Sequence, residues 1–108
     1  MALCALAFGQ STLHVFSLTD ITGTGATVAL ATTGTARFCQ LVALPTNSSG
    51  IRLGDSTTTA SRGSYIAPGG GQFIPPSPGV NNASSVFQLN AVFVYIANSD
   101  KLTGTCWY

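Results

Sequence analysis

The nine residues Ala36–Leu44, "ARFCQLVAL", decide the fold class of this chain. Alternate side chains of an extended strand point to opposite faces. One face of this stretch would carry Cys39, Leu41 and Ala43, and the other would begin with Phe38 and is also largely apolar. A strand that is apolar on both faces suits a central position in a sheet, so we expect this strand to lie inside a β-sheet core.

Similar signals recur along the rest of the chain. Short runs rich in Val, Ile, Phe, Tyr and Thr are separated by Gly, Pro, Asn and Ser, which is typical of strands and turns, and no segment of a dozen residues keeps a helical period. We expect strands at Thr12–Leu18, Ala26–Ala31, Ala36–Leu44, Ile51–Asp55, Gln72–Ile74, Val86–Ala97 and Lys101–Tyr108. The prediction is an all-β chain of about eight short strands, forming an antiparallel β-sandwich, a jelly-roll-like domain or a small barrel.

Two turns suggest hairpins. Pro45–Gly50, "PTNSSG", is dense in turn-forming residues, so we expect Ile51–Asp55 to pair with the strand before it. The turn at Asn98–Asp100 likewise predicts a C-terminal hairpin.

The length of 108 residues suits one domain, residues 1–108. The first ten residues, "MALCALAFGQ", are apolar but lack the Lys or Arg of a signal peptide and are too short to span a bilayer. We interpret residues 1–10 as an N-terminal arm or a first strand.

Charged residues make up only 6% of the chain, there is no Glu, and the formal net charge is +1. Soluble domains typically carry about 25% charged residues, and free monomers usually depend on that charge for solubility. We therefore expect partners to cover much of the surface, in a homo-oligomer of which a trimer is one form. The four Lys and Arg residues are scattered, which argues against nucleic acid and against a basic membrane-binding face.

Cys4, Cys39 and Cys106 are odd in number and widely spaced, with no metal-ligand spacing. The sequence favours three small apolar residues in a reducing compartment. His14 lies inside an apolar strand pattern, which favours a packed, hydrogen-bonded residue. The three aspartates are far apart, unlike a calcium loop, and no cofactor or metal site is expected.

Two short motifs resemble catalytic elements. Gly54-Asp55-Ser56 could present a nucleophile, but no helical pattern follows it and the chain's single His lies upstream. Gly69–Gly71 could cradle a phosphate, but the segment after it cannot start a helix and holds no Lys. We interpret both as turns and expect no enzyme activity and no catalytic residue.

The Pro-rich stretch after the Gly triplet is interpreted as a rigid surface loop or arm, and the C-terminus as a second apolar surface. We expect at least one of Trp107 and Tyr108 to complete the core. The interface residues predicted from the sequence are Phe73, Ile74, Pro75, Pro76, Trp107 and Tyr108. Two Asn-x-Ser patterns, at Asn47 and Asn82, match the glycosylation acceptor motif, which arises readily by chance in an Asn- and Ser-rich chain.

The run Asn47–Gly70, "NSSGIRLGDSTTTASRGSYIAPGG", resembles short β-rich virion proteins of tailed double-stranded DNA bacteriophages. Those chains often close with a turn of the type Gly-Asp-Lys-Val and a short strand. Here Asn98-Ser99-Asp100-Lys101-Leu102 stands in that place, with Ser99 where Gly is commoner. The resemblance covers Ala36–Tyr108.

The resemblance implies a non-enzymatic virion structural protein. Our first expectation is a capsid decoration (cement) protein that binds the major capsid protein on the outer head shell, located in the virion and assembled in the bacterial host cytoplasm. The alternatives are a tail, neck or fibre-associated subunit and, from another class, a carbohydrate-binding β module that would expose Trp107, Tyr65, Tyr95 or Tyr108. A small hydrolase is disfavoured.

Overall fold

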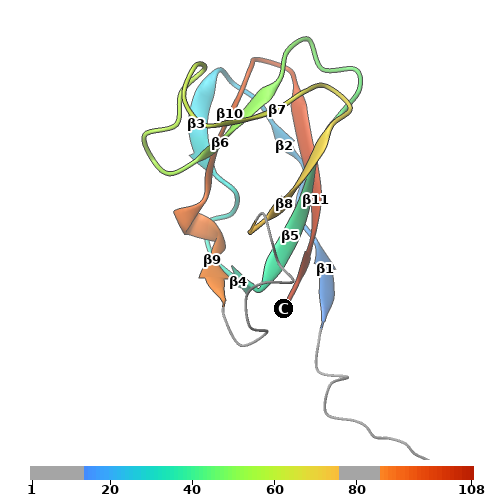
Figure 1. The fold of residues 1–108 in the computed structure, drawn as a ribbon, viewed down its shortest axis with the longest axis vertical. Helices are drawn as coiled ribbons and strands as arrows, with labels where there is room; N and C mark the ends of the chain where they lie inside the picture. The colour runs from blue at the N-terminus through green and yellow to red at the C-terminus, as the bar shows by residue number, and fades with distance from the viewer. Residues whose placement is uncertain (1–13, 76–85) are drawn as a thin grey trace, which may run out of the picture.

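The computed structural model describes residues 14–75 and 86–108. In this part of the chain the strands are all paired antiparallel, and the single helical element is a short 3-10 turn. The predicted all-β class is therefore confirmed for the described residues (Figure 1).

The first sheet has the strand order β1-β11-β5-β8, with β2 pairing β11 beyond the end of β1. Its strands are β1 (Val15–Ser17), β2 (Ile21–Thr22), β5 (Phe38–Ala43), β8 (Gly71–Ile74) and β11 (Lys101–Trp107). β5 lies between β11 and β8, which is the interior position that its two apolar faces predict.

The second sheet has the order β3-β10-β6-β7. Its strands are β3 (Ala26–Ala29), β6 (Ile51–Gly54), β7 (Ser64–Ile66) and β10 (Phe93–Ile96). A separate two-stranded ladder joins β4 (Thr35–Ala36) to β9 (Phe87–Gln88), and η2 (Leu89–Ala91) follows it.

The strand pairs are nested in the sequence. β1 pairs with β11, β3 with β10, β5 with β8, and β6 with β7. The outermost pair joins the start of the described chain to its end, and the innermost pair joins neighbours. The chain therefore folds as a long antiparallel double strand that crosses repeatedly between the two sheets.

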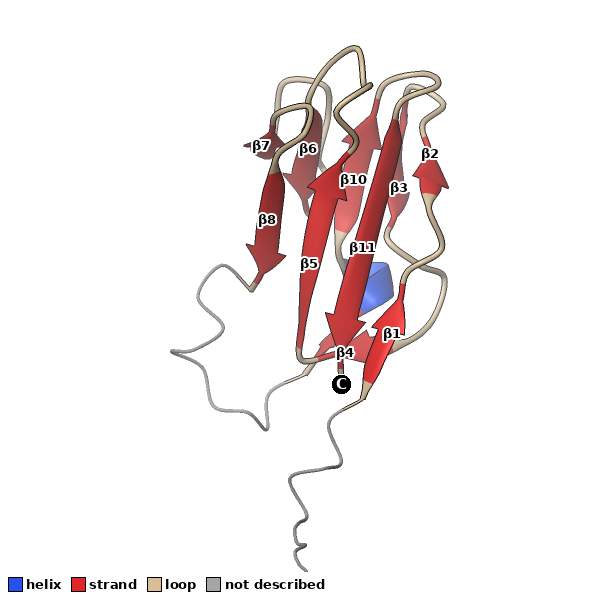
Figure 2. Ribbon diagram, turned by 90° about the vertical axis from the view of Figure 1, so that its right-hand side faces the viewer, coloured by secondary structure: helices blue, strands red, loops and turns tan. Residues whose placement is uncertain are grey.

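The two sheets face each other across one buried core (Figure 2). The alternation predicted for Ala36–Leu44 holds, because Cys39, Leu41 and Ala43 are all fully buried. The core cluster consists of Leu30, Ala36, Cys39, Leu41, Ala43, Ile51, Leu53, Ile66, Ile74, Leu89, Val94, Ile96, Leu102 and Cys106. Both sheets contribute to it, which gives a sandwich-like architecture.

Both predicted hairpins are wrong. β6 pairs with β7 and β10 in the second sheet, whereas β5 pairs with β8 and β11 in the first. β10 and β11 also lie in different sheets. The turns at Pro45–Gly50 and Asn98–Asp100 therefore carry the chain across the sandwich, and turn chemistry alone does not distinguish such a crossing from a hairpin.

The element boundaries also differ from expectation. The stretch Val86–Ala97 was expected to be one strand, but it is divided into β9, η2 and β10. The short strand β2 also forms between the predicted strands Thr12–Leu18 and Ala26–Ala31, where no strand was predicted. The described residues hold eleven strands, of which β2, β4 and β9 are two residues long.

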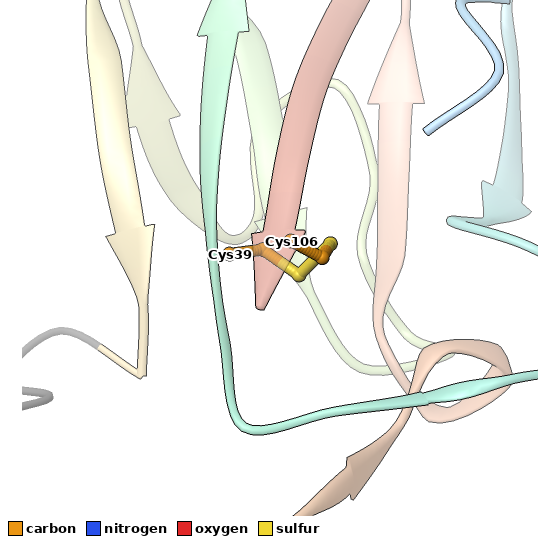
Figure 3. The surroundings of a disulfide bond; sticks show 2 residues. All are labelled: Cys39 and Cys106. Carbon is orange, nitrogen blue, oxygen red and sulfur yellow. A yellow bond between two sulfur atoms is a disulfide. The ribbon is translucent and has the colours of Figure 1, made fainter. Parts of the chain in front are cut away.

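Cys39 and Cys106 form a disulfide between β5 and β11, with a sequence separation of 67 residues (Figure 3). The two residues are direct cross-strand partners, their Cα atoms are 4.0 Å apart, and both are fully buried. Their interpretation as free thiols is therefore wrong. Cys4 lies outside the described residues.

Candidate interaction surface

The segment after β6 forms a local turn built on Asp55. The Asp55 carboxylate accepts hydrogen bonds from the hydroxyl and the backbone N–H of Thr57, the latter at 2.8 Å, and these bonds lower the pKa of the carboxyl. The Thr58 hydroxyl donates to the Asp55 carbonyl oxygen at 2.6 Å. His14 directly precedes β1, on the other sheet. The fold thus builds a turn from Gly54-Asp55-Ser56, as expected, and brings no histidine to Ser56.

The Gly triplet also forms a turn. Gly69 has a φ of +79°, a left-handed conformation that favours glycine. The Gly69 N–H donates to the carbonyl of Ala43 at 2.9 Å, and the Gly70 N–H donates to the carbonyl of Ala67 at 2.7 Å. Gly71 then begins β8, so a strand follows where a phosphate loop requires a helix.

The residues predicted as an interface around β8 lie in different environments. Phe73 is 43% exposed, whereas Ile74 points into the core and is buried. Pro75 is half-buried, and Pro76 lies outside the described residues. Alternation along β8 therefore leaves Phe73 as the exposed apolar side chain of this group.

At the C-terminus, neither Trp107 nor Tyr108 belongs to the buried core, so the expectation that one of them completes it is wrong. Cys106 takes the core position, which turns Trp107 to the outer face of the first sheet. Tyr108 is 45% exposed, and the guanidinium of Arg37 lies over its ring at 5.8 Å.

Three aromatic side chains and one valine gather on this outer face. We call the four residues the aromatic patch: Val15, Phe38, Phe73 and Trp107. Val15 and Phe38 are the cross-strand partners of Trp107 on its two sides. Phe38 stacks on Trp107 with ring centroids 4.8 Å apart, and it meets Phe73 edge-on at 6.4 Å. Val15 is 62% exposed. The patch therefore crosses all four strands of the β1-β11-β5-β8 array.

The structure joins Phe73 and Trp107, predicted separately, into one surface through Phe38, which sequence reasoning did not select. The signal for Phe38 was available in its alternation with Cys39 and Leu41, since burial of those two residues turns Phe38 outward. What the sequence lacked was the register that places Phe38 opposite Trp107.

Polar and small residues complete the outer face. One step along the strands from Trp107, the outward-facing cross-strand neighbours Ser17, Thr105 and Gln40 lie in line with Phe73. One step further are Thr103, Val42 and Gly71. The outward-facing residues of β11 end with one charged side chain, Lys101, at the end of the strand far from Trp107. The face is therefore apolar at one end, hydroxyl- and amide-bearing in the middle, and almost uncharged.

The second sheet presents a different row on its own outer face. Tyr95, Arg52 and Tyr65 are neighbours across β10, β6 and β7. The Arg52 guanidinium lies 5.0 Å from the centre of the Tyr65 ring and donates to the Gly63 carbonyl at 3.0 Å. Tyr65 is 57% exposed. The aromatic residues considered for carbohydrate binding are thus divided between two opposite faces.

The turn between β10 and β11 is fastened to the loop between β5 and β6 through Asp100. The Asp100 carboxylate is buried and accepts hydrogen bonds from the backbone N–H groups of Ser48 at 2.8 Å and Ser49 at 3.1 Å, and from both hydroxyls. The Ser48 N–H bond is the largest of the causes that lower the pKa of Asp100, and burial partly opposes them. The two crossing loops therefore depend on a charged carboxylate.

Asn47 adds a second link between the same loops. Its side-chain amide donates to the Lys101 carbonyl and its side-chain oxygen accepts from the Lys101 N–H, both at 2.8 Å. This amide is engaged on both sides, which supports a structural role for the Asn-x-Ser pattern there. Asn82, in the other such pattern, lies outside the described residues.

Ser99, where the phage resemblance favours Gly, has a φ of +73°. Non-glycine residues are uncommon in this left-handed region. Its N–H donates to the Gly23 carbonyl at 3.0 Å, and the Gly23 N–H donates to the Asp100 carbonyl at 2.7 Å. The backbone conformation of Ser99 is therefore one that glycine adopts more readily than serine.

Residues 14–75 and 86–108 contain no group of three or more His, Cys, Asp or Glu side chains arranged to hold a metal ion. Across the same residues, no helix has the length and apolar character needed to cross a membrane. The chain matches no protein-family model, no curated protein and no solved structure.

Proposed function

We propose that this chain is a jelly-roll building block of a tailed-phage virion, and specifically a capsid decoration protein that binds the outer head shell and stabilises the joints between capsid subunits. Its role is non-enzymatic. The protein acts by burying apolar surface and by forming hydrogen bonds across the boundaries between capsid subunits.

The nested strand pairing carries this proposal. A jelly roll packs eight strands in two four-stranded sheets and is a recurrent fold of viral capsid and lectin domains. Within the described part of the chain, eight strands have three or more residues, and in order they pair first with last, second with seventh, third with sixth and fourth with fifth. This order supports a jelly roll, with β2, β4 and β9 as additional short pairings.

Fold alone does not assign function. The argument for a virion role therefore depends also on the sequence resemblance. The run Asn47–Gly70, which resembles phage virion proteins, covers β6, β7 and the Gly turn before β8. The left-handed residue Ser99 occupies the place where such proteins often carry Gly. Both features belong to the framework of the domain, so they support a shared fold and a shared structural role.

The low charge supports an assembled state. A chain with four basic and three acidic residues has little charge to keep copies apart in solution. Exposed apolar side chains such as Val15 and Phe73 add to the surface that partners would cover.

The strongest alternative within the same class is a tail, neck or fibre-associated subunit, for which the fold and charge are equally suitable. Copy number separates the two, since a head shell requires hundreds of copies and a tail or neck far fewer.

The carbohydrate-binding alternative has one specific observation in its favour, the row Tyr95–Arg52–Tyr65. Exposed aromatic rings stack on sugar faces, and an arginine between two of them adds hydrogen-bond donors. Binding on a glycan array that disappears in Tyr65→Ala, but persists in Phe73→Ala on the opposite sheet, would favour this function over the proposed one.

The decoration role is tested on heads assembled without the protein. We expect such heads to lose DNA at a lower temperature and under milder osmotic shock than complete heads, and to recover when the purified protein is added back. Heads whose resistance is unchanged by loss and by addition of the protein would contradict the proposal.

A further inference from the structure

We propose that the outer face of the β1-β11-β5-β8 array is a self-association surface, on which a second copy of this chain packs face to face around a two-fold axis. The inference deepens the proposed function, on which its place in the virion rests, by naming the partner of the aromatic patch.

The patch favours contact over exposure. Four apolar side chains are contiguous on it, and Phe38 and Trp107 are stacked against each other rather than against the core. Their packing fixes the rings in place before any partner binds, so little side-chain entropy remains to be lost on association. A rigid aromatic cluster of this kind is typical of the residues that dominate binding energies.

The charge of the face indicates which partner fits. Lys101 lies at the far end of β11, and the Arg37 guanidinium lies over Tyr108 at the near edge of the sheet. The outward-facing positions between them are apolar, glycine, hydroxyl or amide residues. A strongly charged partner would lose hydration there without gaining a counter-charge. A second copy presents the same nearly uncharged face. A two-fold axis through the patch would place the same residues of the two copies against each other, as isologous contacts require.

The geometry of the sheet also suits a copy of itself. Two sheet faces pack about 10 Å apart with their strands nearly aligned. Four strands spaced by about 4.8 Å and seven residues of β11 rising about 3.4 Å each give a footprint of about 450 Å² per copy. The total of about 900 Å² is in the class of weak, transient interfaces.

The dimer should therefore be weak in dilute solution and populated at high local concentration. A virion surface that carries many copies side by side supplies that concentration. The expected dissociation constant lies between tens of micromolar and about 1 mM, the range of weak association.

Trp107 is the single tryptophan of the chain, so its fluorescence reports directly on the patch. Sedimentation of the purified, oxidised protein from about 10 µM to 1 mM should show the mass rising from 11.0 kDa toward twice that value. The Trp107 emission should shift to shorter wavelength over the same range, because a partner removes water from the ring.

The test variant is Phe73→Asp, which places a charge in the patch at a side chain that is already 43% exposed. Its matched control is Tyr65→Asp, at an exposed aromatic residue on the opposite sheet. We expect Phe73→Asp to weaken dimerisation at least tenfold and to abolish the emission shift, while Tyr65→Asp dimerises as the wild type does. Circular dichroism of both variants checks that the fold is retained.

A wild-type protein that stays monomeric at 1 mM would overturn the inference, as would equal dimerisation of the two variants. A monomer whose binding to heads is lost in Phe73→Asp would assign the face to the capsid instead, which also overturns it. A chain that dimerises as predicted but is absent from virions would leave the inference standing and contradict the proposed function.

Discussion

The disulfide is the feature whose removal should change stability most. Reduction of Cys39–Cys106 leaves the amino-acid sequence and the core side chains in place and removes a cross-link that closes a loop of 67 residues. In the chain-entropy model a loop of that length stabilises the fold by about 4 kcal/mol at 25 °C, because the cross-link restricts the unfolded chain. A loss of this size is a large fraction of the 5–15 kcal/mol typical of native domains.

Guanidinium denaturation, followed by circular dichroism with and without a phosphine reductant, measures the effect. With a denaturant slope of about 3 kcal/mol per molar for a domain of this size, about 4 kcal/mol corresponds to a midpoint about 1.3 M lower in the reduced protein. Cys4→Ala is the control, because it keeps the bond and should show the same difference between oxidised and reduced forms.

The reasoning would be refuted by a reduced protein whose midpoint falls by less than about 0.3 M, a shift worth only about 1 kcal/mol. It would equally be refuted by a non-reduced peptide map in which Cys4, rather than Cys39, is linked to Cys106.

Three further predictions concern the crossing loops. Asp100 has a pKa below its ordinary value in the folded chain, so its contribution to stability is present above about pH 4 and is lost as the pH falls through the lowered pKa. When the unfolding midpoint is measured at decreasing pH, it should therefore fall less steeply in Asp100→Asn than in the wild type. Ser99→Gly should raise stability by about 0.5–1 kcal/mol in thermal denaturation, because glycine adopts the left-handed φ without strain, whereas Asn98→Gly should not raise it. Gly23→Ala should lower the stability of the fold by about 2–3 kcal/mol in the same assay, since the Cβ of the new alanine would lie 2.2 Å from the Ala97 carbonyl oxygen. An unchanged midpoint would contradict this and show that the turn can move to accept the Cβ.

The elements that follow local rules could be predicted from the sequence. The alternation in Ala36–Leu44 gives both the strand and its buried face, since Cys39, Leu41 and Ala43 all point inward. The Gly69–Gly71 turn and the turn at Asp55 follow from residue types whose preferences act within a few positions. These features depend on neighbours in the sequence and need no knowledge of the sheet.

The choice of sheet partner could not be predicted, because it depends on residues far apart in the chain. The turns Pro45–Gly50 and Asn98–Asp100 have the composition of hairpin turns, yet each crosses between sheets and is fastened to the other through Asp100 and Asn47. A local pattern predicts that the chain changes direction. Packing in the core determines whether the next strand pairs with the previous one in the same sheet or lies in the opposite sheet.

The same limit explains the missed disulfide and the incomplete patch. Cys39 and Cys106 each look like a small apolar residue in a strand, and only the register between β5 and β11 reveals them as partners. That register also sets Phe38 beside Trp107. One pairing of strands thus determines the cross-link on the inner face and the candidate interface on the outer face.

The decoration role is tested most directly by the copy number of this chain relative to the major capsid protein, measured by quantitative mass spectrometry on virions purified from the source of the chain. The decoration role predicts hundreds of copies per particle, on heads with and without tails. A few dozen copies or fewer, or a chain found only on tails, would contradict it.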